Sequence, residues 1–225
     1  MAKVIVVTDS TSGLPAELAR QNHVIVGAQT LIWGEETFLD SVNIQPDEFY
    51  QRLATASVMP SSSQISPAGF EKIFRELLEQ DYDVLAVLVS TKLSGTINSA
   101  VQAKAAINSD RIEIVDSDSV AMAMGFGVLH AARLAAQGAS LAECKSAAEE
   151  ACKRTGVVLT VDTLEFLYRG GRIGGASRFL GTALNIKPIL ELKEGRLEPL
   201  ERVRTRAKAV ARLMDLLDER TGGKP

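Results

Sequence analysis

The stretch Asp83–Ala106 reads DVLAVLVSTKLSGTINSAVQAKAA and decides the fold of this chain. Its apolar run Val84–Val89 contains no glycine, proline or charge, which is typical of a buried parallel strand. A helix-forming segment rich in alanine follows, and the polar loop Ser94–Thr96 joins the two. The unpaired N–H groups and the dipole at a helix N-terminus favour an anion. The stretch therefore predicts a strand, an anion-binding loop and a helix.

The composition bounds the class of protein. The chain has 225 residues and a net charge of −3, which argues against a nucleic-acid partner or a broad anionic-membrane surface. Cys144 and Cys152 lack the spacing of a metal or disulfide site, so a reduced compartment is the default. A strand directly after Met1 predicts no signal peptide, and the most apolar window, Val120–Ala136, is shorter than the ~20 residues of a membrane helix. We expect a cytoplasmic protein.

Strands and helices alternate over the first ~150 residues, which is typical of parallel α/β folds. The predicted strands are Lys3–Val7, His23–Leu31, Thr37–Leu39, Val84–Val89, Arg111–Val115, Gly156–Val161, Ile186–Leu192 with an interruption at Pro188, and Arg196–Arg204. Predicted helices begin near Pro15 and cover Pro46–Ala56, Ala68–Gln80, Val120–Gln137, Ser140–Arg154 and Thr205–Arg220. The pattern predicts a mainly parallel three-layer α/β domain, residues 1–154, and a smaller α+β domain, residues 155–225.

Three polar loops stand out as candidate binding segments: Ser61–Ser66, Thr91–Thr96 and Arg169–Gly175. The first lies in a serine-rich segment, Met59–Pro67, which is predicted as a loop that ends in the helix cap Ser66. In open α/β sheets, ligands lie beyond the carboxyl ends of the strands, where such loops meet. Hydroxyl and N–H groups can hold a carboxylate or phosphate, and an arginine adds a charge-assisted fork. Each loop alone could be only a linker, cap or turn, but together they predict one polar site.

Sequence motifs exclude several kinds of catalytic site. The chain contains no P-loop, no G-x-G-x-x-G dinucleotide motif and no G-x-S-x-G elbow. Its two histidines, His23 and His130, suit structural or solvated positions better than catalytic ones. Asp9, Asp116 and Asp118 follow predicted strands, so they could hold a divalent metal or cap turns.

At these loops the sequence resembles the DegV family, whose studied members are the fatty-acid-binding subunits of a bacterial fatty acid kinase. The matching motifs are Thr8-Asp9-Ser10, Ser62–Pro67, Leu93–Thr96, Asp116-Ser117, Leu164–Ile173 and Leu184–Leu190. They stand in the family's order and span nearly the whole chain. Leu-Ser-Gly-Thr and Gly-Gly-Arg-Ile together with Asn-Ile-Lys-Pro form the specific part of the resemblance.

The resemblance implies a lipid-binding carrier subunit rather than a self-sufficient enzyme. No catalytic residue, metal or cofactor is implied, and the ligand is a long-chain fatty acid in a tunnel between the two domains. Its carboxylate lies at the polar mouth, where a separate ATP-dependent kinase subunit phosphorylates it to an acyl phosphate. By position, Ser62 and Ser94 would hydrogen-bond the carboxylate, and Arg172 would lie near the mouth. Ser63 and Thr96 complete the expected set of fatty-acid-binding residues.

The resemblance also suggests how the carrier meets its partners. Arg202 and Arg204 would lie on the face that docks the kinase, and peripheral contact with a membrane is a further expectation. Ser62 departs from the family's usual threonine. The chain reaches Pro225 without the late His-and-Gly motif of the family, so the second domain is expected to be shortened at its C-terminal end.

Two questions stay open at the level of sequence. The Met- and Gly-rich helix within Val120–Leu134 could leave room for an acyl chain, because methionine adapts to irregular apolar shapes, or it could be a close-packed core helix. The function also has alternatives: a metal-dependent enzyme on a small phosphorylated or carboxylated metabolite, or a family member that serves only in protein–protein contact.

Overall fold

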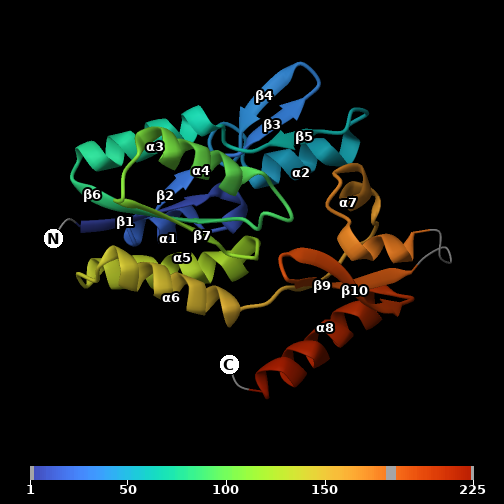
Figure 1. The fold of residues 1–225 in the computed structure, drawn as a ribbon. Helices are drawn as coiled ribbons and strands as arrows, with labels where there is room; N and C mark the ends of the chain where they lie inside the picture. The colour runs from blue at the N-terminus through green and yellow to red at the C-terminus, as the bar shows by residue number, and fades with distance from the viewer. Residues whose placement is uncertain (1–2, 181–185, 224–225) are drawn as a thin grey trace. The chain divides into compact units, whose positions relative to one another are not determined.

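The computed structural model describes residues 3–180 and 186–223, and the chain divides into two compact units after Thr155. A four-stranded parallel sheet in the order β2-β1-β6-β7 forms the centre of the first unit (Figure 1). Its strands are β1 (Lys3–Asp9), β2 (Ile25–Gly27), β6 (Tyr82–Leu88) and β7 (Ile112–Asp116). The predicted α/β class is confirmed. That the chain consists of two domains with a boundary after Arg154 stays a prediction.

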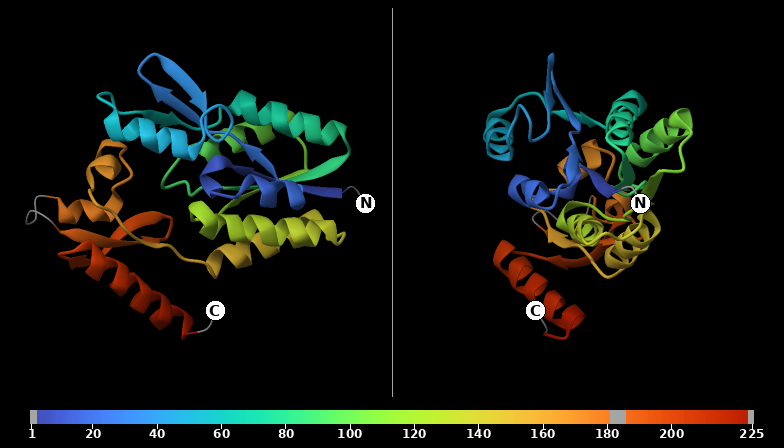
Figure 2. Two further views of the ribbon diagram at one scale, coloured as in Figure 1. Left: turned by 180° about the vertical axis from the view of Figure 1, so that it is seen from behind. Right: turned by 90° about the vertical axis from the view of Figure 1, so that its left-hand side faces the viewer.

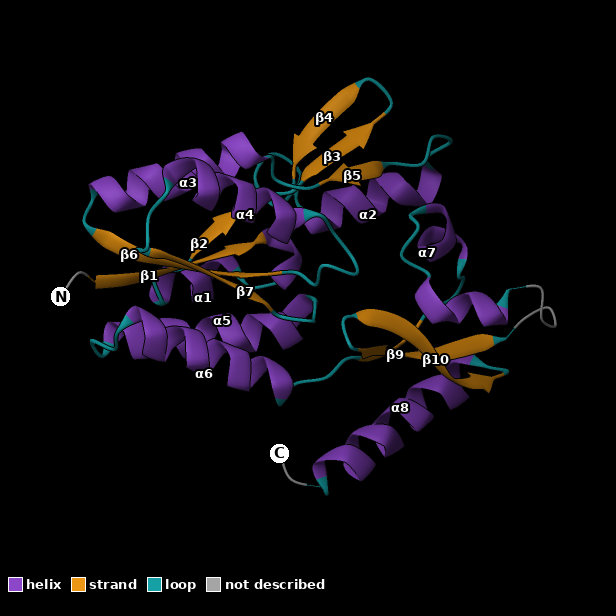
Figure 3. Ribbon diagram, in the orientation of Figure 1, coloured by secondary structure: helices purple, strands orange, loops and turns teal. Residues whose placement is uncertain are grey.

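Helices cover both faces of this sheet (Figures 2 and 3). Side chains of β1 and β6 alternate between the faces, as the period of a strand requires. Val4, Val6 and Leu85 belong to one apolar core, while Ile5 and Val7 belong to the other. The first core is closed by α5 (Ala121–Ala136) and α6 (Leu141–Lys153), and the second by α3 (Pro67–Glu79) and α4 (Thr96–Ile107). The first unit is therefore layered helix, sheet, helix.

A second sheet of the first unit corrects two predictions. It is antiparallel, in the order β4-β3-β5. The predicted strand His23–Leu31 is wrong as one element, because its two ends belong to different sheets. The predicted loop Met59–Pro67 contains a strand that pairs with β3. The elements here are β3 (Thr30–Trp33), β4 (Glu36–Leu39), α2 (Pro46–Thr55) and β5 (Ser61–Ser63), and the chain before β2 forms the short helices η1 (Ser10–Ser12) and α1 (Ala16–Gln21).

Gly27 marks the point at which the chain leaves the parallel sheet. A Cβ atom at this position would lie 2.6 Å from Cδ1 of Ile65, so no larger residue fits without displacing that side chain. β2 pairs only with Val7–Asp9, at the carboxyl end of β1. The segment after Gly27 therefore starts close to the edge where ligands of open α/β sheets lie.

The second unit is a three-stranded antiparallel sheet, in the order β10-β9-β8, with a long helix packed on it. The predicted interruption at Pro188 is wrong: β9 is continuous, and its pairing with β8 begins only at Ile189. Glu194 and Gly195 have positive φ and form the turn of the hairpin that joins β9 to β10. The elements are β8 (Val158–Thr160), α7 (Glu165–Arg169), η2 (Gly174–Phe179), β9 (Lys187–Lys193), β10 (Arg196–Val203) and α8 (Arg206–Thr221). The motif residues Leu184 and Asn185 lie outside the described residues.

Side chains cap the start of two helices of the first unit, and the cap predicted at Ser66 is confirmed. Ser66 accepts a hydrogen bond from the N–H of Gly69 at the start of α3. Ser140 and Glu143 form a capping box at the start of α6, and the hydrogen bonds from Ser140 lower the pKa of Glu143. Across the described part of the chain, no helix is both long enough and apolar enough to cross a membrane.

Close contact between α5 and α6 gives the first prediction. A Cβ atom at Gly127 would lie 2.5 Å from Sγ of Cys152 and 3.4 Å from the carbonyl oxygen of Ala148. Gly127→Ala is therefore expected to lower the free energy of unfolding by about 1–2 kcal/mol, because overpacking outweighs the gain in helix propensity. Urea unfolding measures this. Gly156→Ala is the control, since a Cβ there meets nothing within 4 Å. Equal stabilities would contradict the expectation.

Candidate ligand-binding site

The loop after β6 carries two hydroxyl groups in contact. Ser94 Oγ lies 2.8 Å from Thr96 Oγ1 and accepts the Thr96 N–H at 3.3 Å. Thr96 is fully buried, whereas Ser94 is only half-buried. Helix α4 begins at Thr96, and its N-cap Gly95 has no side chain, so the side chain at this N-terminus is that of Ser94, which accepts the Thr96 N–H. The predicted pairing of a hydroxyl loop with a helix N-terminus is present.

A second pair of predicted site residues lies on β5 rather than in a loop. Ser62 pairs with Leu31 and Ser63 with Thr30, and both serines are exposed. The residue after them, Gln64, lies against the loop of Ser94: a Cβ atom built on Gly95 would lie 2.8 Å from Gln64 Nε2. The structure therefore places Gln64, the residue after Ser63, against the loop that carries the hydroxyl pair. The predicted place of Ser62 and Ser63 beside that pair stays a prediction.

Two buried residues, Asp9 and Gln29, lie beneath this loop. Asp9 was predicted only as a metal ligand or a turn cap, and Gln29 was not predicted as a site residue. Asp9, fully buried at the end of β1, accepts hydrogen bonds from the backbone N–H of Val89, from the N–H and hydroxyl of Thr11, and from Gln29. Gln29 Nε2 also donates to Thr96 Oγ1 at 3.1 Å. These contacts join the ends of β1 and β6 and the segment after β2. In the sequence, only the position of Asp9 at the end of a strand indicates that its side chain could join these segments.

Arg172 belongs to the second unit and lies in the exposed turn between α7 and η2. Its Nη1 donates to the carbonyl oxygen of Gly170 at 2.5 Å. Its predicted place near the polar mouth stays a prediction. Arg202 stacks on the ring of Phe179, with its Cζ atom 4.5 Å from the ring centroid. The prediction that Arg202 and Arg204 lie on a docking face also stays a prediction.

The acidic residues after the strands act as turn caps. Asp116 accepts hydrogen bonds from the N–H and hydroxyl of Thr91 and from the N–H of Asp118. Over residues 3–180 and 186–223, no cluster of three His, Cys, Asp or Glu side chains is placed to hold a metal ion. The Asp9 carboxylate likewise accepts hydrogen bonds from Thr11, Gln29 and Val89.

The cysteines and histidines are not arranged as nucleophiles. Burial raises the pKa of the Cys144 thiol and raises that of Cys152 to about 11, so both stay protonated near neutral pH. His23 and His130 are exposed, one in a left-handed turn and one on the outer face of α5.

Packing around α5 decides, within the first unit, whether its Met- and Gly-rich stretch leaves room for an acyl chain or is closely packed. Met124 and Leu129 are buried, and the two glycines of the helix lie against neighbouring atoms. A Cβ at Gly125 would lie 3.1 Å from Sδ of Met122 and 3.2 Å from the Ser12 carbonyl oxygen. These small residues therefore permit close packing of α5 in the core. The space for an acyl chain, predicted between the two domains, stays a prediction.

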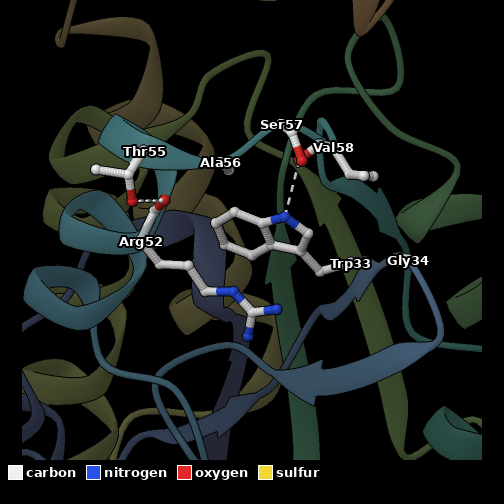
Figure 4. A pocket seen from close by; sticks show the side chains of 7 residues that line it. All are labelled: Trp33, Gly34, Arg52, Thr55, Ala56, Ser57 and Val58. Carbon is white, nitrogen blue, oxygen red and sulfur yellow. Dashed lines mark hydrogen bonds between the residues drawn. The ribbon is translucent and has the colours of Figure 1, made fainter.

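Two pockets of the first unit lie away from the hydroxyl pair. One, of about 300 Å³, is lined by Trp33, Arg52 and the segment Thr55–Val58 (Figure 4). Arg52 stacks over Trp33 at 4.5 Å and pairs with Glu36, which raises the pKa of the guanidinium and lowers that of the carboxyl. The other, about 680 Å³, lies around the start of β1 and the C-terminal end of α5. Neither contains a predicted site residue.

Comparisons with known proteins agree with this architecture. The family model described as "Uncharacterised protein, DegV family" matches residues 3–225. A DegV domain-containing protein from Caldanaerobacter subterraneus is 36% identical over 217 residues, which cover 96% of this chain and 77% of that protein.

Solved structures are similar over the same extent. A DegV family protein from Thermus thermophilus, described for its fatty acid binding, has a TM-score of 0.90 and 38% identity, covering 99% of this chain and 79% of the other. DegV from Bacillus subtilis, described as a fatty acid binding protein, has a TM-score of 0.87 and 33% identity, covering 97% and 78%.

Proposed function

The chain belongs to the DegV family, and from that premise we propose that it binds a long-chain fatty acid by its carboxylate at the Ser94–Thr96 loop. The observation that carries the proposal is the hydroxyl pair at the N-terminus of α4. Relatives above 30% identity from Thermus thermophilus and Bacillus subtilis are described as fatty-acid-binding. A half-buried hydroxyl beside a helix N-terminus suits a carboxylate.

The head group would be held by several hydroxyls at once. Ser94 is the main donor, and Ser62, with Ser63 beside it, supplies hydroxyls from the neighbouring strand β5. The buried Thr96 hydroxyl would hold the Ser94 hydroxyl in place through their hydrogen bond. Arg172 of the second unit would supply positive charge. The acyl chain adds about 0.8 kcal/mol for each buried CH₂, so a long chain contributes most of the affinity once an apolar tunnel between the units encloses it.

We further propose that the protein is a carrier subunit without chemistry of its own. It would present the carboxylate to a separate ATP-dependent kinase subunit, where a carboxylate oxygen takes the phosphoryl group and an acyl phosphate results. Arg202 and Arg204 would contribute to the docking face. ATP-dependent activation places this role in the cytoplasm, with peripheral membrane contact for exchange of the fatty acid. No arrangement of the described residues specifically favours the metal-dependent enzyme.

Native mass spectrometry after mild purification tests the binding. We expect a bound species heavier than the bare chain by the mass of a fatty acid, and restored binding when palmitate or oleate is added to delipidated protein. A chain that carries no fatty acid and takes up neither added compound would overturn the proposal. The kinase role is tested separately, by ATP-dependent formation of acyl phosphate only when carrier and kinase subunit are both present.

A further inference from the structure

A continuous series of hydrogen bonds links the buried Asp9 carboxylate to the half-buried hydroxyl of Ser94. Gln29 lies between them and is 6% exposed. Its Nε2 lies 3.3 Å from Asp9 Oδ1 and 3.1 Å from Thr96 Oγ1, and Thr96 Oγ1 lies 2.8 Å from Ser94 Oγ. All four residues belong to the first unit. The direction of each bond in this series can be derived from donor and acceptor chemistry.

The Asp9 carboxylate fixes the orientation of the Gln29 amide. Each carboxylate oxygen already accepts a backbone N–H, from Thr11 on Oδ1 and from Val89 on Oδ2, both at 3.0 Å. An amide oxygen placed against Oδ1 would bring two acceptors together, whereas the NH₂ group supplies a hydrogen. That NH₂ group has a second hydrogen, which reaches Thr96 Oγ1. Gln29 is therefore a donor to Thr96.

The direction of the next bond follows from the burial of Thr96. Its hydroxyl has one hydrogen, and the described contacts of Oγ1 are with Gln29 Nε2 and Ser94 Oγ. If Ser94 donated to Thr96, the Thr96 hydrogen would be buried without an acceptor, which is unfavourable. Thr96 therefore donates to Ser94. Because Ser94 Oγ also accepts the Thr96 N–H, its two lone pairs are occupied and only its own hydrogen is free.

We infer that Gln29 is a positioning residue that makes Ser94 an outward hydrogen-bond donor, so that the site selects ionised long-chain carboxylates over long-chain alcohols. This inference rests on the proposed function. A carboxylate head group has only acceptors to offer and matches a hydroxyl whose lone pairs are taken. An alcohol oxygen can also accept the Ser94 hydrogen, but it carries no charge to strengthen that bond, and its own hydrogen finds no lone pair on Ser94.

The test compares head groups of equal chain length. Gln29→Met keeps the length of the side chain and removes its N–H groups. Dissociation constants of the delipidated full chain are measured for palmitate and for hexadecan-1-ol. The preference for palmitate is expected to fall roughly tenfold in Gln29→Met, because a hydrogen bond to a charged group loses its fixed direction. The matched control is Gln102→Met, an exposed position of α4, which should keep the wild-type preference.

A second pair of variants removes any dependence on the folding of Gln29→Met. Thr96→Val deletes the hydroxyl and should lower the preference, whereas Thr96→Ser retains it and should restore the preference. An unchanged preference in folded Gln29→Met, or equal preferences in Thr96→Val and Thr96→Ser, would overturn the role of Gln29. Failure of the proposed function is seen separately, because then the wild-type chain itself binds no palmitate.

Discussion

Ser94→Ala is expected to weaken palmitate binding by roughly 10- to 100-fold, which is the loss of one hydrogen bond to a charged group. The variant leaves the carboxylate beside the N-terminus of α4 without its main hydroxyl donor. It also removes the acceptor of the Thr96 hydroxyl, which must then find another partner in a buried position. Titration of delipidated protein with palmitate measures the affinity directly.

Ser146→Ala is the matched control for Ser94→Ala. Ser146 is an exposed residue of α6. Its substitution removes the same hydroxyl oxygen at a position distant in sequence from the Ser94–Thr96 loop. The control should bind palmitate like the wild type. If Ser94→Ala also binds like the wild type, the assignment of the carboxylate to this loop is wrong, although a fatty acid could still be bound elsewhere in the protein.

The strand–loop–helix unit at Asp83–Ala106 was predictable because its signals are local. The uninterrupted apolar run has to be buried on both faces, and Ser94–Thr96 combines hydroxyls with a flexible glycine before a helix-forming segment. The structure confirms a buried strand, Tyr82–Leu88, and a helix that begins at Thr96. Local pattern and tertiary environment agree here, so sequence reasoning reached the right element.

Other elements depend on partners that are distant in sequence. Ser61–Ser63 has poor strand propensity, and it is a strand only because β3 offers an edge with which it pairs. The run His23–Leu31 looks like one strand, yet its halves join different sheets at Gly27, where Ile65 approaches closely. Neither pairing leaves a mark in the local sequence pattern.

The missed site residue shows the same limit. Gln29 is a single amide within an apolar segment, which from sequence has no special meaning. Its importance comes from Thr96, 67 positions later, and from Asp9, 20 positions earlier. Hydrogen bonds across such separations follow from the fold, so Gln29 could be recognised only after the ends of β1 and β6 had been placed.

Asp9 is the residue on which the geometry of this loop cluster depends most. Its carboxylate is fully buried and holds donors from three segments: Thr11 after β1, Gln29 after β2, and the N–H of Val89 after β6. Apolar side chains could fill the same volume but could not accept these hydrogens. Each buried donor left without an acceptor destabilises the folded state by about 1–3 kcal/mol.

Asp9→Ala is therefore expected to lower the free energy of unfolding by about 3–5 kcal/mol, because several buried donors lose their acceptor together. Urea unfolding followed by circular dichroism measures the change. Asp110→Ala removes the same group from an exposed position and should stay within about 0.5 kcal/mol of the wild type. If both variants were equally stable, water or a shifted hydroxyl would have to satisfy the donors. Asp9 would then not be what orders Gln29, Thr96 and, through them, the hydroxyl of Ser94.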